Sequence, residues 1–381
     1  MKNFGIYIHW PFCETKCPYC DFNSHVKKNL KEKEWIKPYL KSLRYWKEYY
    51  DGYKVSSIFF GGGTPSLMSP LIVEEIINEI SKLWILKSNI EISLEANPNS
   101  VDIINLKNLS KIGINRTSIG IQALNDVDLK RLGRNHTKDE AIKSLNICKD
   151  MFENVSFDLI YGRQFQKLKT WEDELTNALK MNTNHISLYM LTIEEGTKFY
   201  EMKTKGKLNG MPKIEEEVEF YKTTNEICEQ YNFQRYEISN FSKNNTPCYH
   251  NLNYWKYGDY LGIGPGAHGR ITQNFKRYRT EAPKIPEKWK NDVENDKISE
   301  FLIKEIKIDE QKQEYLMTSL RLEEGLDKSK FLNITKKKIS KNQISFLKKH
   351  DLLTEGDNFL KATEKGKLLL NKLIYYLCDT I

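Results

Sequence analysis

Three cysteines near the N-terminus, Cys13, Cys17 and Cys20, have the spacing C-x3-C-x2-C. Thiolates this close together can hold one metal ion or one iron–sulfur cluster as the loop wraps around it. A structural zinc ion needs four ligands, usually in two separated pairs. The candidates for a fourth ligand, none at a familiar zinc spacing, are His9, Asp21 and His25. A [4Fe–4S] cluster normally takes four cysteines, so three would leave one iron open to another ligand. The spacing therefore favours a cluster over zinc.

A glycine run, Gly61-Gly62-Gly63-Thr64-Pro65, directly follows the apolar, strand-like run Ser57–Phe60. Glycines let the backbone approach a ligand closely and expose bare amides and carbonyls. A lone glycine run is more often a turn than a site. Its position at a strand end, downstream of the cysteine triplet, favours a ligand site here.

The elements that must position these residues follow from periodicity, since short apolar runs alternate with longer amphipathic ones. The strand-like runs are Gly5–His9, Ser57–Phe60, Ile90–Glu95, Arg116–Ile121, Val155–Ile160 and His185–Leu191. The helical runs are Glu34–Tyr50, Pro70–Trp84, Val101–Ile112, Lys138–Met151, Thr170–Met181 and Ile214–Tyr231. This order predicts an α/β fold with a parallel sheet, most simply a partial (βα)6 barrel.

Functional residues of such barrels lie at the C-terminal ends of the strands. The residues with chemical potential fall there: Cys13, Gly61–Pro65, Glu95, Gln122 and Asp158 each follow one of the first five predicted strands. This agreement between position and chemistry supports the predicted fold.

Three segments are expected along the chain: the barrel in 1–232, an extension and linker in 233–307, and a smaller domain in 308–381. The stretch from about Glu281 to Lys307 is polar and contains prolines, which is typical of a linker. The last segment should contain helices and a short hairpin, which predicts a winged-helix-like α+β domain. Its expected elements are a helix from Glu310, a turn at Leu326-Asp327, a helix over Lys336–Lys349, a hairpin around Glu355-Gly356-Asp357 and a helix from Thr363 towards Cys378.

Composition excludes several classes of protein. Hydrophobic residues make up 39% of the chain and aromatic residues 12%, which is not the profile of a disordered chain. Neither a membrane-spanning run nor a secretory signal is visible, so a cytoplasmic protein is expected. The formal charge of +8 could suggest nucleic-acid binding. Lysines scattered beside glutamates favour a general compositional bias instead, although a basic surface can also attract an anionic membrane.

The triplet, with Tyr19 before its last cysteine, and the glycine run together resemble the signature of the radical S-adenosylmethionine (SAM) superfamily. The resemblance implies a [4Fe–4S] cluster whose open iron binds SAM. Further segments resemble the branch that contains oxygen-independent coproporphyrinogen III oxidase and related heme chaperones: Tyr7–Cys13, Glu91–Pro98, Ile119–Gln122, Leu132–Arg134, Asp158–Gly162 and Tyr260–Gly269.

The resemblance also implies roles for individual residues. Those expected to contact the cluster-bound SAM are Tyr7, Tyr19, Gly62 and Glu95. Those matching positions around a second SAM in the oxidase are Gly63, Thr64, Gln122, Arg134 and Asp158. Each has a plain alternative: the two carboxylates could cap helices or pair with lysines, the glutamine could satisfy backbone groups, and the tyrosine at position 7 could be core.

One departure separates the two kinds of protein in this branch. The oxidase carries a further cysteine two residues after the triplet, where this chain has Phe22, and this pattern resembles the heme chaperones. The segment His250-Asn251-Leu252-Asn253-Tyr254-Trp255 resembles their heme-binding motif HNxxYW. By that resemblance His250 would ligate heme iron and Asn251, Tyr254 and Trp255 would contact the heme; Cys248 and His268 are rival ligands. The alternative is a hydrogen-bonded histidine and a core tryptophan.

The sequence thus predicts a heme-binding chaperone on a radical SAM scaffold, which passes heme to a recipient hemoprotein such as a respiratory-chain protein. The alternative is an enzyme that decarboxylates the propionates of coproporphyrinogen III by radical chemistry. Nucleic-acid binding by the C-terminal helices is not expected. Peripheral membrane contact and a homodimer are both compatible with the sequence.

Overall fold

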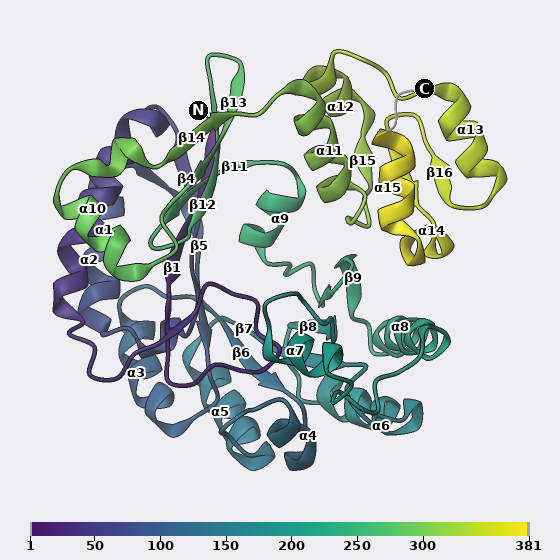
Figure 1. Ribbon diagram of the computed structural model, residues 1–381, viewed down its shortest axis with the longest axis horizontal. Coiled ribbons are helices and arrows are strands. Elements are labelled where there is room, and N and C mark those ends of the chain that lie inside the picture. The colour runs from purple at the N-terminus through teal and green to yellow at the C-terminus, as the bar shows by residue number, and fades with distance from the viewer. Residues whose placement is uncertain (1, 379–381) are drawn as a thin grey trace.

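A twelve-stranded sheet forms the centre of the protein (Figure 1), and the computed structural model describes residues 2–378. Its middle part runs in the order β1-β4-β5-β6-β7-β8, and neighbouring strands pair in parallel. The bounds are β1 (Asn3–Trp10), β4 (Lys54–Gly62), β5 (Ile85–Ala96), β6 (Arg116–Gln122), β7 (Asn154–Tyr161) and β8 (His185–Met190). Each contains or overlaps a predicted strand, and the predicted partial barrel is confirmed.

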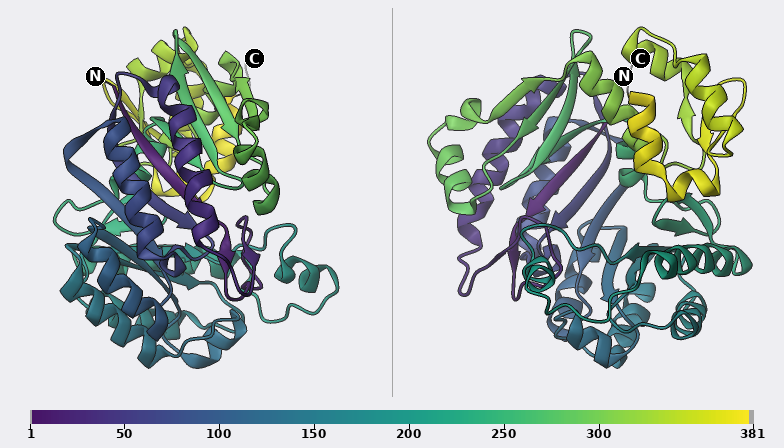
Figure 2. Two further views of the ribbon diagram at one scale, coloured as in Figure 1. Left: turned by 90° about the vertical axis from the view of Figure 1, so that its left-hand side faces the viewer. Right: turned by 45° about the vertical axis from the view of Figure 1, so that its right-hand side comes forward.

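Helices cover the outer face of this sheet, as the left view of Figure 2 shows for the first two. They are α1 (Lys33–Trp46), which η1 (Lys47–Tyr50) extends, α2 (Pro70–Leu83), α3 (Ser100–Lys111), α5 (Lys138–Met151), α6 (Leu168–Leu179) and α8 (Ile214–Gln230). Local chemistry sets some of their starts. Pro70 occupies the first turn of α2, and a capping box between Thr137 and Glu140 begins α5. Phe4, Ile6 and Ile8 of β1 are fully buried in the resulting core.

Further strands extend the sheet at both edges. β11 (Asp259–Ile263) pairs in parallel with β1 and is followed by the antiparallel strands β12 (His268–Gln273), β13 (Lys276–Glu281) and β14 (Leu302–Glu305). On the other edge β10 (Asn240–Ser242) pairs antiparallel with β8, and β9 (Gln234–Glu237) pairs with β10. The sheet is therefore continuous across the segment boundary expected after residue 232.

The stretch expected to be a linker is packed structure, so that prediction is wrong. It contains α10 (Pro286–Glu294), η3 (Lys297–Glu300) and β14. Trp289 on α10 is fully buried and lies parallel to Trp35 of α1, with ring centroids 6.3 Å apart. Only one face of α10 is apolar, and its charged outer face gives the sequence the composition of a linker.

The C-terminal part has its own hydrophobic core and a three-stranded sheet in the order β15-β17-β16. Its elements are α11 (Ile308–Ser319), β15 (Leu326–Asp327), α12 (Lys328–Thr335), α13 (Lys341–Lys349), β16 (Leu353–Glu355), β17 (Phe359–Ala362), α14 (Glu364–Leu368) and α15 (Leu370–Cys378). The hairpin lies where predicted. The helix expected over Lys336–Lys349 begins only at Lys341, because Lys336 adopts a left-handed conformation that ends α12. Residues 379–381 lie outside the described residues.

A charged cluster holds this part against the edge of the large sheet, above β9 in Figure 1. Arg235 on β9 donates to Glu323 and Glu364, each at 2.6 Å. Lys367, almost fully buried, also pairs with both glutamates. Within residues 2–378 no helix is long and apolar enough to cross a membrane.

Candidate cofactor site

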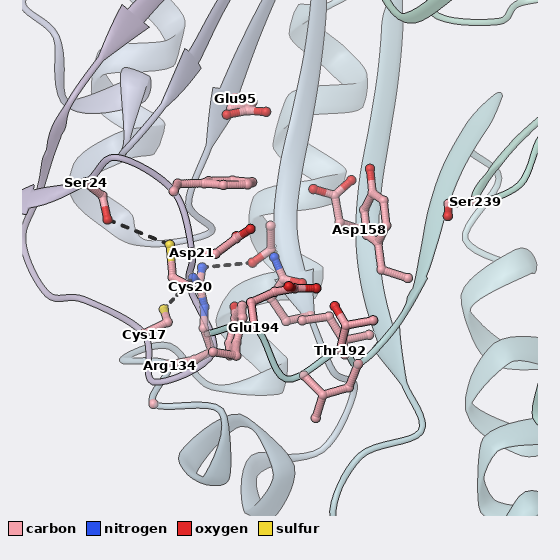
Figure 3. A pocket seen from close by; sticks show the side chains of 18 of the residues that line it. Cys17, Cys20, Asp21, Ser24, Glu95, Arg134, Asp158, Thr192, Glu194 and Ser239 are labelled. Carbon is pink, nitrogen blue, oxygen red and sulfur yellow. Dashed lines mark hydrogen bonds between the residues drawn. The ribbon is translucent and has the colours of Figure 1, made fainter. Parts of the chain in front are cut away.

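A cavity of about 750 Å³ opens at the C-terminal ends of the barrel strands (Figure 3). Most residues singled out from the sequence line it: Cys13, Cys17, Tyr19, Cys20, Gly62, Gly63, Thr64, Glu95, Gln122, Arg134 and Asp158. Tyr7 and the His250–Trp255 segment are not among its lining residues. The structure therefore brings the cysteines and the strand-end residues together and leaves the heme-motif segment elsewhere.

The cysteines lie on a loop closed by the pairing of β2 (Phe12–Cys13) with β3 (His25–Val26). All three are free thiols and partly exposed. Among the side chains that the structure describes, which leave out residues 100–104, no three His, Cys, Asp or Glu converge closely enough to hold a single metal ion. In an iron–sulfur cluster each cysteine binds a different iron, so three free thiols on one loop can serve as ligands to three irons.

Each of the three thiols has a hydrogen-bonding neighbour. Thr64 Oγ1 donates to Cys13 Sγ at 3.4 Å, and Arg134 Nη1 donates to Cys17 Sγ at 3.4 Å. Cys20 Sγ lies 3.7 Å from Ser24 Oγ. Figure 3 shows the arginine and Ser24 beside their cysteines. Such donors would stabilise the thiolate forms that an iron–sulfur cluster requires.

The glycine run packs directly beneath the cysteine loop. Gly63 N donates to Trp10 O at 2.6 Å, and Thr64 N donates to Phe12 O at 2.9 Å. A Cβ at Gly63 would lie 2.7 Å from Phe12 O and 3.0 Å from Cys13 Sγ. Because no side chain fits there, the loop can approach this closely only over glycine.

A second glycine places Arg134. Gly133 has a φ of +68°, and a Cβ there would lie 2.6 Å from Pro18 Cδ of the cysteine loop. The arginine that follows donates from Nη2 to Asn97 Oδ1 at 2.6 Å and to Gly120 O at 2.9 Å. Asn97 also lines the cavity. Asn97 lies within the segment Glu91–Pro98, and nothing in the sequence pattern distinguishes it from its neighbours as a site residue.

Two carboxyl groups face the cavity from the strands on either side of β6, Glu95 on β5 and Asp158 on β7. Burial, and then the nearby charge of Asp158, raise the pKa of Glu95 to about 8. Burial raises the pKa of Asp158 to about 6, against the hydrogen bonds from Ser187 and Ser118. Neither forms an ion pair with a lysine of the described chain. Carboxyl groups perturbed in this way are suited to a ligand that brings a cationic or hydroxyl group.

The other three predicted site residues considered are Gln122, Tyr19 and Tyr7. Gln122 has a φ of +72°, an uncommon conformation for a residue other than glycine, at a break in the β6–β7 register. Tyr19 packs against Phe199, with ring centroids 6.4 Å apart. The hydroxyl of Tyr7 lies 3.1 Å from His9 Nδ1. Strain at a cavity-lining residue such as Gln122 is typical of functional sites.

The segment resembling the heme motif forms α9 (Tyr249–Trp255), whose histidine is buried. His250 Nδ1 shares a hydrogen bond with Ser57 Oγ at 2.8 Å, and Nε2 shares one with Tyr254 Oη at 2.7 Å. Its ring stacks on Phe59, with centroids 5.0 Å apart. Burial lowers the pKa of His250 to about 3, so the ring is neutral. Both ring nitrogens are engaged, and iron ligation would require one of these bonds to break.

The N-terminus of α9 is held by a buried ion pair. Glu91 accepts from Tyr249 N at 3.1 Å and from His250 N at 3.0 Å. Its partner Arg116 donates to it at 2.9 Å from Nε, and both side chains are nearly inaccessible. The rest of the segment is only partly buried: Asn251 and Tyr254 are half-buried, and the ring of Trp255 lies near Arg321.

The two rival heme ligands differ in access. Cys248 is buried, and its thiol donates to Glu91 Oε1 at 3.4 Å. His268, at the start of β12, has 51% of its side chain exposed, and Nε2 lies 4.0 Å from Glu281 Oε1. Of the three candidates, only His268 presents an accessible side chain in this conformation.

Comparisons with known proteins agree with this arrangement. Residues 7–176 match the family model of the radical SAM superfamily. The chain is 36% identical to the heme chaperone HemW of Haemophilus influenzae, over 98% of this chain and 97% of that protein. It is 32% identical to the heme chaperone HemW of Escherichia coli, over 98% of each. Among solved structures, coproporphyrinogen III oxidase (HemN) from Escherichia coli superposes with a TM-score of 0.82, covering 100% of this chain and 91% of that chain at 18% identity. A likeness at that identity shows the fold alone.

Proposed function

Because the chain belongs to the HemW family of radical SAM proteins, we propose that it is a heme chaperone, which binds heme and passes it to a recipient hemoprotein. The observation that carries this proposal is similarity over the full length. It includes the α9 segment and the C-terminal domain as well as the barrel.

The oxidase alternative is not favoured. Relatives that match nearly the whole chain, among them those from Haemophilus influenzae and Buchnera aphidicola, carry the heme chaperone name, whereas the oxidase shares the fold at 18% identity. Phe22 stands where the oxidase pattern has a further cysteine, and its side chain is exposed at the cavity.

We propose that Cys13, Cys17 and Cys20 hold a [4Fe–4S] cluster and that SAM binds beside it. When bound, the cluster supplies an electron that can cleave a carbon–sulfur bond of SAM. The protein's part is to bind and orient. The Gly62 amide and the Glu95 carboxyl, joined at 3.2 Å, lie at the strand ends that face the cysteine loop. The other proposed contacts are Tyr7, Tyr19, Gly63, Thr64, Gln122, Arg134 and Asp158.

We further propose that heme binds at α9, with His250 as ligand after it releases Ser57 or Tyr254. The partly buried Tyr254 and Trp255 would supply aromatic contacts for the macrocycle. His268 is the accessible alternative ligand.

An anaerobic heme titration of the cluster-loaded protein, followed by the Soret absorbance, tests the proposal. Saturable binding is expected, and His250→Ala should weaken it at least tenfold. His185→Ala is a matched control, because His185 is also a buried, hydrogen-bonded histidine but lies on β8, outside the heme-motif segment. Loss of affinity only in His268→Ala would move the ligand to β12. The absence of saturable binding in the unaltered protein would contradict the chaperone function.

The setting is also part of the proposal. We infer a cytoplasmic protein whose recipients include respiratory-chain hemoproteins, with contact at the membrane surface and no nucleic-acid partner. Heme transfer to an apo-cytochrome in vesicles, compared with transfer in their absence, measures the membrane contribution. Light scattering with and without heme tests whether the chain forms a homodimer.

A further inference from the structure

Two of the three cysteine thiols belong to one hydrogen-bonded network. Arg134 Nη1 donates directly to Cys17 Sγ at 3.4 Å. The other terminal nitrogen, Nη2, donates to Asn97 Oδ1 at 2.6 Å. Asn97 Nδ2 then donates to Thr64 Oγ1 at 3.3 Å, and that hydroxyl donates to Cys13 Sγ at 3.4 Å. A single guanidinium is thus connected to both sulfurs, once directly and once through Asn97.

The chemistry of the side chains determines which group donates in each hydrogen bond of this network. A guanidinium can only donate, so the asparagine must present its oxygen to Arg134 and its amide nitrogen to Thr64. The threonine hydroxyl accepts from that nitrogen, which leaves its own hydrogen for Cys13 Sγ. The third thiol, Cys20, has Ser24 as its neighbour and stands outside the network. Asn97 therefore sets the orientation of the hydroxyl that reaches Cys13.

Donors aimed at cluster ligands change how readily the cluster takes up an electron. Reduction adds one negative charge to the cluster and its thiolates. Hydrogen bonds to the sulfurs, and a nearby positive charge, stabilise the reduced state more than the oxidised state and so raise the reduction potential. The effect is larger in a partly desolvated site, where electrostatic interactions are less screened. The cysteine loop lies at such a site, at the edge of the cavity.

We propose that Asn97 is a positioning residue that connects Arg134 to Thr64 and thereby raises the reduction potential of the cluster held by Cys13, Cys17 and Cys20. This inference rests on the cluster proposed above. It gives Arg134 and Thr64 a role towards the cysteine thiols, and it assigns a function to Asn97, which is connected to the thiols through these two residues.

The test is an EPR-monitored redox titration of cluster-loaded protein with dithionite, comparing the unaltered chain with Asn97→Ala. At a fixed solution potential the variant should show at least a tenfold lower ratio of reduced to oxidised cluster, equivalent to about 59 mV for one electron. Asn135→Ala is the matched control. Asn135 also lines the cavity beside the cysteine loop, but its amide donates to Thr15 Oγ1 and not towards a sulfur.

A pair of variants at Thr64 distinguishes the proposed relay, which is the hydrogen-bonded connection from Arg134 through Asn97 to Thr64, from a general disturbance of the cysteine loop. Thr64→Val removes the hydroxyl at similar volume and should lower the potential, whereas Thr64→Ser retains the hydroxyl and should stay near the unaltered value. Because Asn97 acts through Thr64, the double variant Asn97→Ala/Thr64→Val should have the potential of Thr64→Val alone.

The outcomes are distinct. If the unaltered protein binds no iron after anaerobic reconstitution, the proposed cluster itself fails. If the cluster binds and Asn97→Ala titrates like Asn135→Ala, or if the two single-variant shifts add in full, the relay is refuted. Should Asn97→Ala fail to retain the cluster, the Thr64→Val and Thr64→Ser pair decides: equal potentials overturn the inference.

Discussion

Replacing Glu91 with glutamine is expected to destabilise the protein by about 3–5 kcal/mol, the cost typical of removing one partner from a buried ion pair. The carboxylate is 6% exposed and accepts from four donors. Glutamine keeps the shape of the side chain. It replaces one accepting oxygen with an NH2 group, which must then face Arg116 or the backbone amides at the start of α9.

The size of the expected shift in melting temperature follows from chain length. With 381 residues and an unfolding entropy near 2.1 cal/mol/K per residue, a change of about 0.8 kcal/mol in the free energy of unfolding shifts the melting temperature by one degree. A loss of 3–5 kcal/mol therefore lowers the melting temperature by about 4–6 °C. This loss includes the charge of Arg116, which would remain without compensation on a side chain that is 4% exposed.

Thermal unfolding followed by circular dichroism measures this shift, and Glu34→Gln is the control. Glu34 also forms an ion pair, with Lys290, but its side chain is 51% exposed, so Glu34→Gln should lower the melting temperature far less than Glu91→Gln. The double variant Glu91→Gln/Arg116→Met should be less destabilised than the sum of the two single variants, because it leaves no unpaired charge. Equal melting temperatures for Glu91→Gln and Glu34→Gln, or full additivity in the cycle, would refute the reasoning.

Three further outcomes are expected. Cys17→Ser should abolish loading of the [4Fe–4S] cluster, measured by iron content and visible absorbance. Full loading would exclude Cys17 as a ligand. Trp289→Ala should lower the free energy of unfolding, measured with urea, by about 3–5 kcal/mol, because the side chain is fully buried where α10 packs against α1. A decrease below about 1 kcal/mol would show that Trp289 does not anchor α10. The pKa of His250 is lowered to about 3 in the folded state, so the unfolded chain binds the proton first and stability falls as pH drops from 6.5 towards 3. From pH 7 to pH 5 the titration of His250 should lower the free energy of unfolding by about 2 kcal/mol. Urea titrations of the cluster-free protein at both pH values should show that this part of the pH dependence is missing in His250→Gln. Identical pH profiles for the two proteins would contradict the buried, neutral ring.

The barrel and the cavity could be predicted from sequence for a definite physical reason. Parallel strands covered on both faces are nearly continuous apolar runs, so β1 and β4 stand out from the polar helices between them. Residues at the carboxyl ends of such strands must meet at one edge of the sheet. Cysteines and glycines at those positions therefore fall into one cavity without any knowledge of the loops.

The strands at the edges of the sheet and the region around α10 could not be predicted in this way, because they are not apolar runs in the sequence. β12 and β13 carry charged residues, including Arg277, whose guanidinium is buried against Asp259 at 2.7 Å. A strand that buries ion pairs looks like a surface loop in a hydrophobicity pattern. The partners of His250 were equally hidden, because Ser57 lies on β4, far away in the sequence, and only the folded sheet brings it to α9.

The pairing of β1 with β11 has a consequence for how the chain is made. Phe4 pairs with Asp259, so more than 250 residues separate two strands that lie side by side in the finished sheet. At 5–20 residues per second, β1 would leave the ribosome roughly 13–50 s before its second neighbour. During that time an apolar strand with Phe4, Ile6 and Ile8 has one unpaired edge, which is a template for association with other chains. Newly made protein is therefore expected to depend on holdase binding during translation, and slower synthesis of the region before β11 should increase aggregation.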